Sequence, residues 1–100
     1  MSTAVEKLEV LRDTCGDEAD LDRVLGKLLE VALGRYKNRL ERYDRELEEF
    51  EERHGMDSET FHRRFEAGEL GDGMDFFEWA GLYELREDLA EKIQRLESVA

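Results

Sequence analysis

The sequence predicts an all-α fold, an antiparallel helical hairpin of two long helices with a short helix at the corner, which dimerises into a four-helix bundle. Two observations carry this prediction. Apolar residues recur every three or four positions over residues 18–53 and again over 76–97, the spacing that places side chains on one face of a helix. The stretch between these patterns, residues 55–83, concentrates glycines and aromatic residues, which is typical of a corner in the chain.

The chain length fits one domain. One hundred residues lie near the commonest domain size, and we expect a single helical-hairpin domain over residues 17–100. Residues 1–16 place only Val5, Leu8 and Leu11 on one face, so we expect a weak helix or a mobile arm there.

The first long helix has an apolar stripe that is broad at its beginning and narrow at its end. The stripe consists of Leu21, Leu25, Leu28, Ala32, Tyr36, Leu40, Tyr43, Leu47 and Phe50. In the first half it is broadened by Val24, Leu29, Val31 and Leu33. Two helices with narrow seams cannot cover this broad surface, and burial of each large aliphatic side chain is worth roughly 1.5–3 kcal/mol. We therefore expect a homodimer.

Two glycines, Gly26 and Gly34, interrupt the same helix. Each costs about 1 kcal/mol relative to alanine. They lie eight residues apart and so roughly on one face, which fits either a close helix–helix approach or chance. The helix should end at Gly55, which can adopt the left-handed conformation after a positively charged last turn.

The corner contains the same short helix-start signal twice: Gly-Met-Asp, followed four residues later by an aromatic residue. Asp57 is expected to cap the short helix, with Met56 packing on Phe61. Gly68 ends that helix, and a Gly-Asp-Gly turn follows at residues 71–73.

The second copy of the signal precedes the last helix. Asp75 is expected to cap that helix, with Met74 packing on Trp79. The seam of the last helix should consist of Trp79, Leu82, Leu85, Leu89, Ile93 and Leu96.

The net charge of the chain indicates which classes of partner it favours. Charged residues make up 42% of the chain and the net charge is -12, which disfavours nucleic acid because phosphate binding relies on Lys and Arg. The negative charge fits a basic protein partner. It is explained equally well if it only keeps the protein soluble or is an adaptation to a salty host cytoplasm. A strip of Arg35, Arg39 and Arg42 leaves a small DNA-binding regulator as an alternative, but neighbouring carboxylates largely cancel it.

The location is expected to be cytoplasmic. No apolar run approaches the roughly 18 residues that a membrane span requires, so no membrane contact is expected. The first residues lack the basic and apolar regions of a signal peptide. The single cysteine, Cys15, cannot form an internal disulfide, which fits a reducing compartment.

The sequence contains no recognisable catalytic motif. His54 and His62 are the only histidines, and a metal site would need carboxylates such as Glu51, Glu59 or Glu66 to converge on them. No Cys/His cluster, phosphate-binding loop or nucleophile–base pair is present. We therefore expect no enzyme activity, no metal site and no cofactor.

The aromatic residues of the corner are the candidate partner-binding residues. They outnumber what one corner needs, and aromatic side chains dominate binding hot spots. The candidates are Phe76, Phe77, Trp79 and Tyr83. For any one of them, a place in the core beneath the turn is the competing interpretation.

The corner also resembles a known group of proteins. Its most specific segments are FEERHGMDSETFHRRFEAGELGD and DFFEW, within a likeness that covers residues 30–97. These segments resemble small acidic all-helical proteins of bacteria and archaea, some of which are labelled antitoxins of toxin–antitoxin pairs. The resemblance implies a neutralising partner of a small basic, RNA-cleaving toxin and no catalytic motif.

The leading functional hypothesis is therefore a non-catalytic protein-interaction module that acts as such an antitoxin-like partner. A structural, oligomerising coiled-coil protein with no toxin partner is the alternative from another class, beside the DNA-binding regulator.

Overall fold

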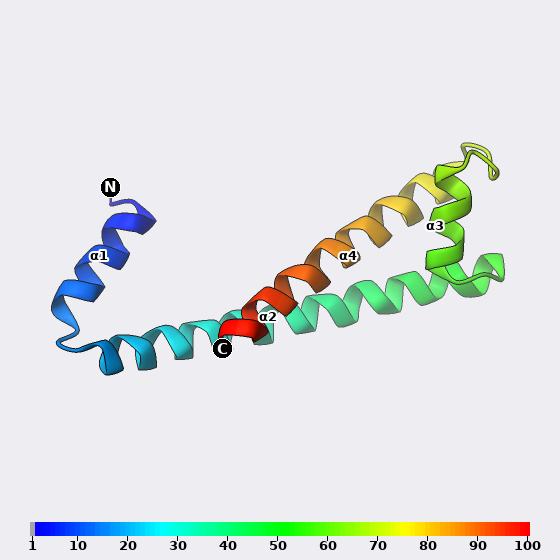
Figure 1. Cartoon of the computed structure of the whole chain (residues 1–100). Coiled ribbons are helices and arrows are strands. Elements are labelled where there is room, and N and C mark those ends of the chain that lie inside the picture. Colours follow the sequence, from blue (N-terminus) through cyan, green and yellow to red (C-terminus); the bar gives the residue numbers. More distant parts are fainter. Residues whose placement is uncertain (1) are drawn as a thin grey trace.

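A computed structural model describes residues 2–100 of the chain, and this part is helical without any strand. The helices are α1 (Ala4–Thr14), α2 (Glu18–His54), α3 (Ser58–Glu66) and α4 (Met74–Val99). The long helices α2 and α4 run antiparallel and pack together, and the short α3 closes their common end (Figure 1). The predicted hairpin with a short corner helix is confirmed.

Local signals define both ends of α2. At its start, the Asp17 carboxylate accepts a hydrogen bond from the backbone N–H of Asp20 over 2.8 Å. At its end, Gly55 adopts a left-handed conformation with φ of 68°, and its N–H donates to the carbonyl of Glu51 over 2.8 Å. Glycine takes up this conformation without the steric cost that a Cβ would add. The helix therefore stops one residue beyond the predicted range.

The two long helices differ in length, and this leaves part of α2 uncovered. Helix α2 has 37 residues and α4 has 26. Near the C-terminal end of α4, Glu97 lies 4.0 Å from the amine of Lys37, so α4 reaches only about the middle of α2. The first half of α2 continues past it, and α1 turns back at its far end (Figure 1). We call α1 together with α2 up to Arg35 the N-terminal arm.

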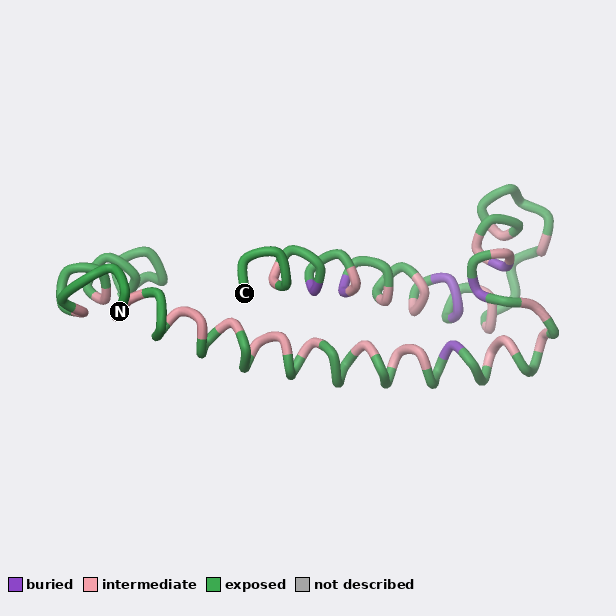
Figure 2. Tube along the Cα trace, turned by 60° about the horizontal axis from the view of Figure 1, so that its bottom comes forward, coloured by how far each residue is buried: buried purple, intermediate pink, exposed green. Residues whose placement is uncertain are grey.

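The core lies at the closed end of the hairpin. Its buried side chains are Leu47 from α2, Phe61 from α3, and Trp79 and Ala80 from α4. Two further buried residues of α4, Leu89 and Ile93, continue the contact toward its C-terminus (Figure 2). The N-terminal arm contains no buried residue among those described.

The start of α4 differs from the prediction. Gly73 occupies the N-cap position, and having no side chain it offers no side-chain cap. The prediction that Asp75 caps this helix is wrong, because Asp75 lies within the first turn and its carboxylate pairs with Arg53 over 2.8 Å. The predicted packing of Met74 on Trp79 is also wrong, since Met74 is 73% exposed.

The seam of α4 matches the expected one at every position but one. Trp79, Leu89 and Ile93 are buried, and Leu82 and Leu96 are partly buried. Leu85 was predicted to face α2 but is 54% exposed. The next residue, Arg86, points toward α2 instead and donates from Nε to the carboxylate of Asp44 over 2.9 Å. The covered face is followed by a step of four residues from Leu82 to Arg86, and Leu85 lies about 100° around the helix from Arg86.

No helix within residues 2–100 is both long enough and apolar enough to cross a membrane.

Candidate interaction site

Trp79 lies at the centre of the junction between α2, α3 and α4. Its ring stacks on Phe61 at a centroid distance of 3.7 Å, with an interplanar angle of 4°. Phe50 and His54 of α2 stack on the same indole at 5.7 and 5.3 Å. Trp79 and Phe61 are fully buried. The prediction that Trp79 contacts a partner is therefore wrong, because three helices already enclose the ring.

A polar chain ties the same junction together. The indole N–H of Trp79 donates to the hydroxyl of Ser58 over 2.9 Å, and that hydroxyl donates to the Glu51 carboxylate over 2.8 Å. The same carboxylate oxygen accepts the backbone N–H of Ser58 over 2.7 Å. Buried polar groups need such partners, since an unmade hydrogen bond in the core is costly. Sequence reasoning missed this role of Ser58, whose only visible signal was its place at the start of α3.

The other three predicted partner-binding aromatics differ in exposure. Phe76 and Tyr83 are half-buried, the former packed on Phe61 at 5.7 Å and the latter on His62 at 5.0 Å. Phe77 is 55% exposed, and its ring meets Phe65 edge-on at 5.5 Å. Among the four, Phe77 alone offers most of its side chain to a partner.

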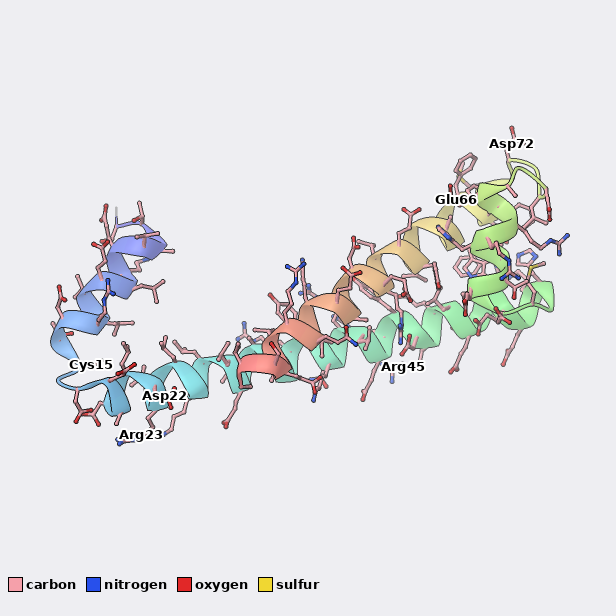
Figure 3. All side chains as sticks on the ribbon, viewed as in Figure 1. Cys15, Asp22, Arg23, Arg45, Glu66 and Asp72 are labelled. Atoms are coloured by element: carbon pink, nitrogen blue, oxygen red, sulfur yellow. The ribbon has the colours of Figure 1, made fainter. Side chains whose placement is uncertain are left out.

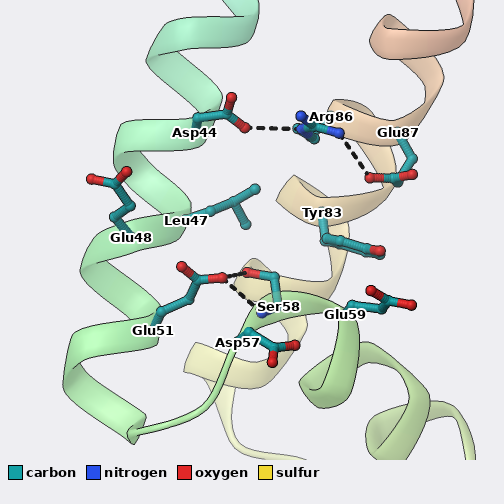
Figure 4. A pocket seen from close by; sticks show the side chains of 10 residues that line it. All are labelled: Asp44, Leu47, Glu48, Glu51, Asp57, Ser58, Glu59, Tyr83, Arg86 and Glu87. Carbon is teal, nitrogen blue, oxygen red and sulfur yellow. Dashed lines mark hydrogen bonds and ion pairs between the residues drawn. The ribbon is translucent and has the colours of Figure 1, made fainter.

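An acidic pocket of about 420 Å³ lies between the three helices of the junction (Figure 4). It is lined by Asp44, Leu47, Glu48, Glu51, Asp57, Ser58, Glu59, Tyr83, Arg86 and Glu87. Carboxylates dominate the lining, and the one cationic side chain, Arg86, is paired with Asp44 at 2.9 Å and Glu87 at 3.1 Å. The pocket therefore suits a cationic group rather than an anionic one.

Three groups that line this pocket have shifted pKa values, namely Arg86, Tyr83 and Asp57. The hydrogen bond to Asp44 raises the pKa of Arg86 above its ordinary value. Burial raises the pKa of Tyr83, and the charges of Glu87 and Glu59 add to the effect. The shift of Arg86 follows from its carboxylate partner, that of Tyr83 comes chiefly from burial, and the pKa of Asp57 is lowered by the backbone N–H of Thr60.

The two predicted capping residues act in different ways. Asp57 is the N-cap of α3 and accepts the backbone N–H of Thr60 over 2.7 Å, which lowers the pKa of Asp57. The pKa of Asp75 is lowered chiefly by its hydrogen bond from Arg53. His54 Nε2 lies 3.4 Å from the Asp75 carboxylate without hydrogen-bond geometry, and it has no other partner within residues 2–100.

The tertiary fold brings His62 close to two carboxylates. Its Nε2 lies 3.5 Å from Glu66, one turn further along α3, and 3.1 Å from Glu84 of α4. The sequence pointed to Glu66 as a neighbour of this histidine, but Glu84 is 22 residues away and was missed.

The N-terminal arm projects beyond the end of α4 with its side chains around it (Figure 3), and it carries most of the exposed large apolar side chains. Of the ten large apolar side chains that are exposed in the described chain, six lie on it: Val5, Leu8, Val10, Val24, Leu28 and Val31. The last three follow one another at steps of four and three, so they share one face of α2. A groove of about 310 Å³ runs beside them, lined by Leu28, Val31, Ala32, Arg35, Tyr36 and Arg39.

Gly26 and Gly34 have open space around them. A Cβ added at either position would meet no atom within 4 Å. Within one chain, these glycines therefore do not mark a close approach of helices.

No known protein family, curated protein or solved structure matches this chain.

Proposed function

We propose that this protein is a non-catalytic interaction module, which dimerises through its N-terminal arm and binds a small basic protein in an antitoxin-like manner. The observation that carries the proposal is the apolar face of the arm, which α4 is too short to cover.

The energetic argument starts from three side chains. Val24, Leu28 and Val31 are exposed on one face of α2, and Leu28 is 58% exposed. Because full burial of such a side chain is worth roughly 1.5–3 kcal/mol, covering this face supplies a substantial driving force for association.

A second copy of the chain is the occupant that fits this face. The apolar stripe that α4 covers in the second half of α2 continues, broader, through the first half. An identical arm offers a matching stripe of the same length, and a twofold arrangement covers both stripes at once. Two arms of two helices each then form a four-helix contact of the kind found in helical bundles.

The dimer is tested by two matched substitutions and a measurement of mass. Leu28→Asp should shift the protein from dimer to monomer in sedimentation equilibrium at micromolar concentration. Leu85→Asp is the control, since Leu85 is also an exposed leucine, at 54%, but lies on α4 outside the arm. A wild-type monomer, or dissociation by Leu85→Asp alone, would contradict the arm as the dimer surface.

The basic partner is supported by charge and by the resemblance of the corner to antitoxin-like proteins. The net charge is -12, and the acidic pocket gathers carboxylates where an arginine or lysine side chain of a partner would be attracted. Exposed Phe77 does not line this pocket, but it lies against Phe65 of α3 and offers a separate apolar anchor at the closed end of the hairpin.

Co-expression with any small basic protein encoded beside this chain's gene tests the second half of the proposal. We expect the pair to co-purify, and we expect Glu48→Lys, a charge reversal at the pocket, to weaken the complex. If the dimer forms but no basic neighbour exists or binds, the protein is an oligomerising coiled-coil module. A gel shift at physiological salt would instead indicate the DNA-binding alternative.

A further inference from the structure

His62, Glu66 and Glu84 form a group of metal-ligating atoms outside the acidic pocket. The nearest nitrogen and oxygen atoms of the three side chains all lie within 4.8 Å of one another. Two of the ligands share one face of α3, being four residues apart, and the third comes from α4. We propose that these three residues bind a divalent transition-metal ion of the Zn²⁺ class and that the ion clamps α3 onto α4.

The spacing of the atoms fits such an ion. Zn²⁺ binds histidine nitrogen and carboxylate oxygen at about 2.0–2.2 Å in tetrahedral geometry, so neighbouring ligand atoms stand about 3.3 Å apart. The two separations from His62 Nε2 are 3.1 Å to Glu84 and 3.5 Å to Glu66, on either side of that value. Both glutamates are more than half exposed, so their carboxylates can adjust when the ion enters.

The imidazole separates this group from the many carboxylates on the surface. Clusters of carboxylates alone suit Mg²⁺ and Ca²⁺, which prefer oxygen ligands, whereas imidazole favours Zn²⁺, Cu²⁺ and Ni²⁺. His62 is also held in place, because its ring packs on Tyr83 at 5.0 Å and its side chain is only 24% exposed. A ligand whose ring is already oriented loses less freedom when it binds a metal.

The site has a structural consequence for the hairpin. Helix α3 has nine residues, too few to be stable without tertiary contacts. An ion held by both helices adds a link near the end of α3, opposite the Ser58 contact at its beginning. Since the ion binds only the folded arrangement, it should raise the unfolding temperature. Three protein ligands leave one coordination position to water.

Isothermal titration with Zn²⁺ at pH 7 and about 0.15 M salt tests the proposal under conditions where diffuse charge attraction is screened. We expect one ion per chain. His62→Gln and Glu84→Gln should each weaken Zn²⁺ binding by at least about tenfold. That is the lower end of the loss seen when a residue that only supports a metal ligand is replaced. Glu91→Gln is the matched control, because Glu91 is exposed on α4 and the substitution removes the same charge. Glu84 is exposed, so the fold should survive its substitution.

The outcomes distinguish a specific metal-binding site from nonspecific attraction of cations to the negative surface. Tight binding of Zn²⁺ over Mg²⁺, a Zn²⁺-dependent rise in unfolding temperature that both site variants reduce, and a tetrahedral Co²⁺ absorption spectrum would support the clamp. Equal binding of Zn²⁺ and Mg²⁺, or equal losses in Glu84→Gln and Glu91→Gln, would show counterion attraction by a protein of charge -12 and would overturn it. Mass measurements on the arm variants do not depend on this result, so the two proposals fail independently.

Discussion

The indole N–H of Trp79 donates to the hydroxyl of Ser58 over 2.9 Å, at the one place where α2, α3 and α4 meet. The Ser58 hydroxyl in turn donates a hydrogen bond to the Glu51 carboxylate. One hydroxyl is therefore both acceptor and donor between the three helices. The core of the protein is therefore specified by a polar contact as well as by aromatic packing.

Ser58→Ala should destabilise the protein by about 1–3 kcal/mol, because the buried indole N–H loses its acceptor. Urea unfolding followed by circular dichroism measures the difference. Ser98→Ala is the matched control, since Ser98 is exposed near the end of α4 and its hydroxyl bonds only to the nearby carbonyl of Arg95. Equal losses for the two variants would show that the Trp79–Ser58 bond contributes nothing.

Phe61 and Phe77 should respond differently to the same truncation. Phe61→Ala empties the fully buried site beneath Trp79 and should cost about 3–5 kcal/mol. Phe77→Ala removes a ring that is 55% exposed and should change stability by about 0.5 kcal/mol or slightly more. Thermal unfolding measures both losses of stability, and the loss in Phe61→Ala should be the larger.

The same pair distinguishes core from contact surface. If Phe77 anchors a partner, Phe77→Ala should weaken the complex with the basic neighbour while leaving the hairpin folded. Unchanged affinity in that variant would remove Phe77 from the interaction surface.

Gly55 and Gly34 should give opposite effects when each is replaced by alanine. Gly55 has φ of 68°, where an added Cβ costs about 1–2 kcal/mol, so Gly55→Ala should destabilise the end of α2. Gly34 lies in open space in mid-helix, so Gly34→Ala should stabilise by about 0.5–1 kcal/mol. Chemical denaturation of the two variants tests the signs. A loss in Gly34→Ala accompanied by dissociation would place that glycine at a close dimer contact.

Arg53→Gln should raise the pKa of Asp75 toward the ordinary carboxyl value, because the hydrogen bond from Arg53 is the main cause of its lowering. NMR titration of the side-chain carboxyls measures this directly. Asp57 is the internal control, since its lowered pKa comes mainly from the backbone N–H of Thr60 and should not move.

The stability linked to Asp75 follows from the direction of its shift. A carboxyl with a lower pKa in the folded state stabilises the fold above its unfolded pKa, near 3.8. That contribution should vanish as the pH falls through the folded pKa. Arg53→Gln should therefore be less stable than wild type at pH 7 and should approach it at strongly acidic pH. A gap that persists there would show that the arginine acts by packing.

The sequence by itself determined the helices and most of their ends. The three-to-four-residue spacing of apolar side chains, the left-handed glycine at Gly55 and the Asp57 cap are local features, and each acts within a few residues of the chain. They sufficed for the hairpin, the corner helix and the broad apolar stripe at the start of α2.

Only the tertiary structure decided which side chains meet. Periodicity identifies a face only to within about one residue, so it did not separate Leu85, which is exposed, from Arg86, which reached Asp44. The packing of the three helices enclosed Trp79, left Phe77 exposed and brought Glu84 to His62. These contacts join residues about 20 or more positions apart, and their geometry depends on how the rings of three helices pack at one junction.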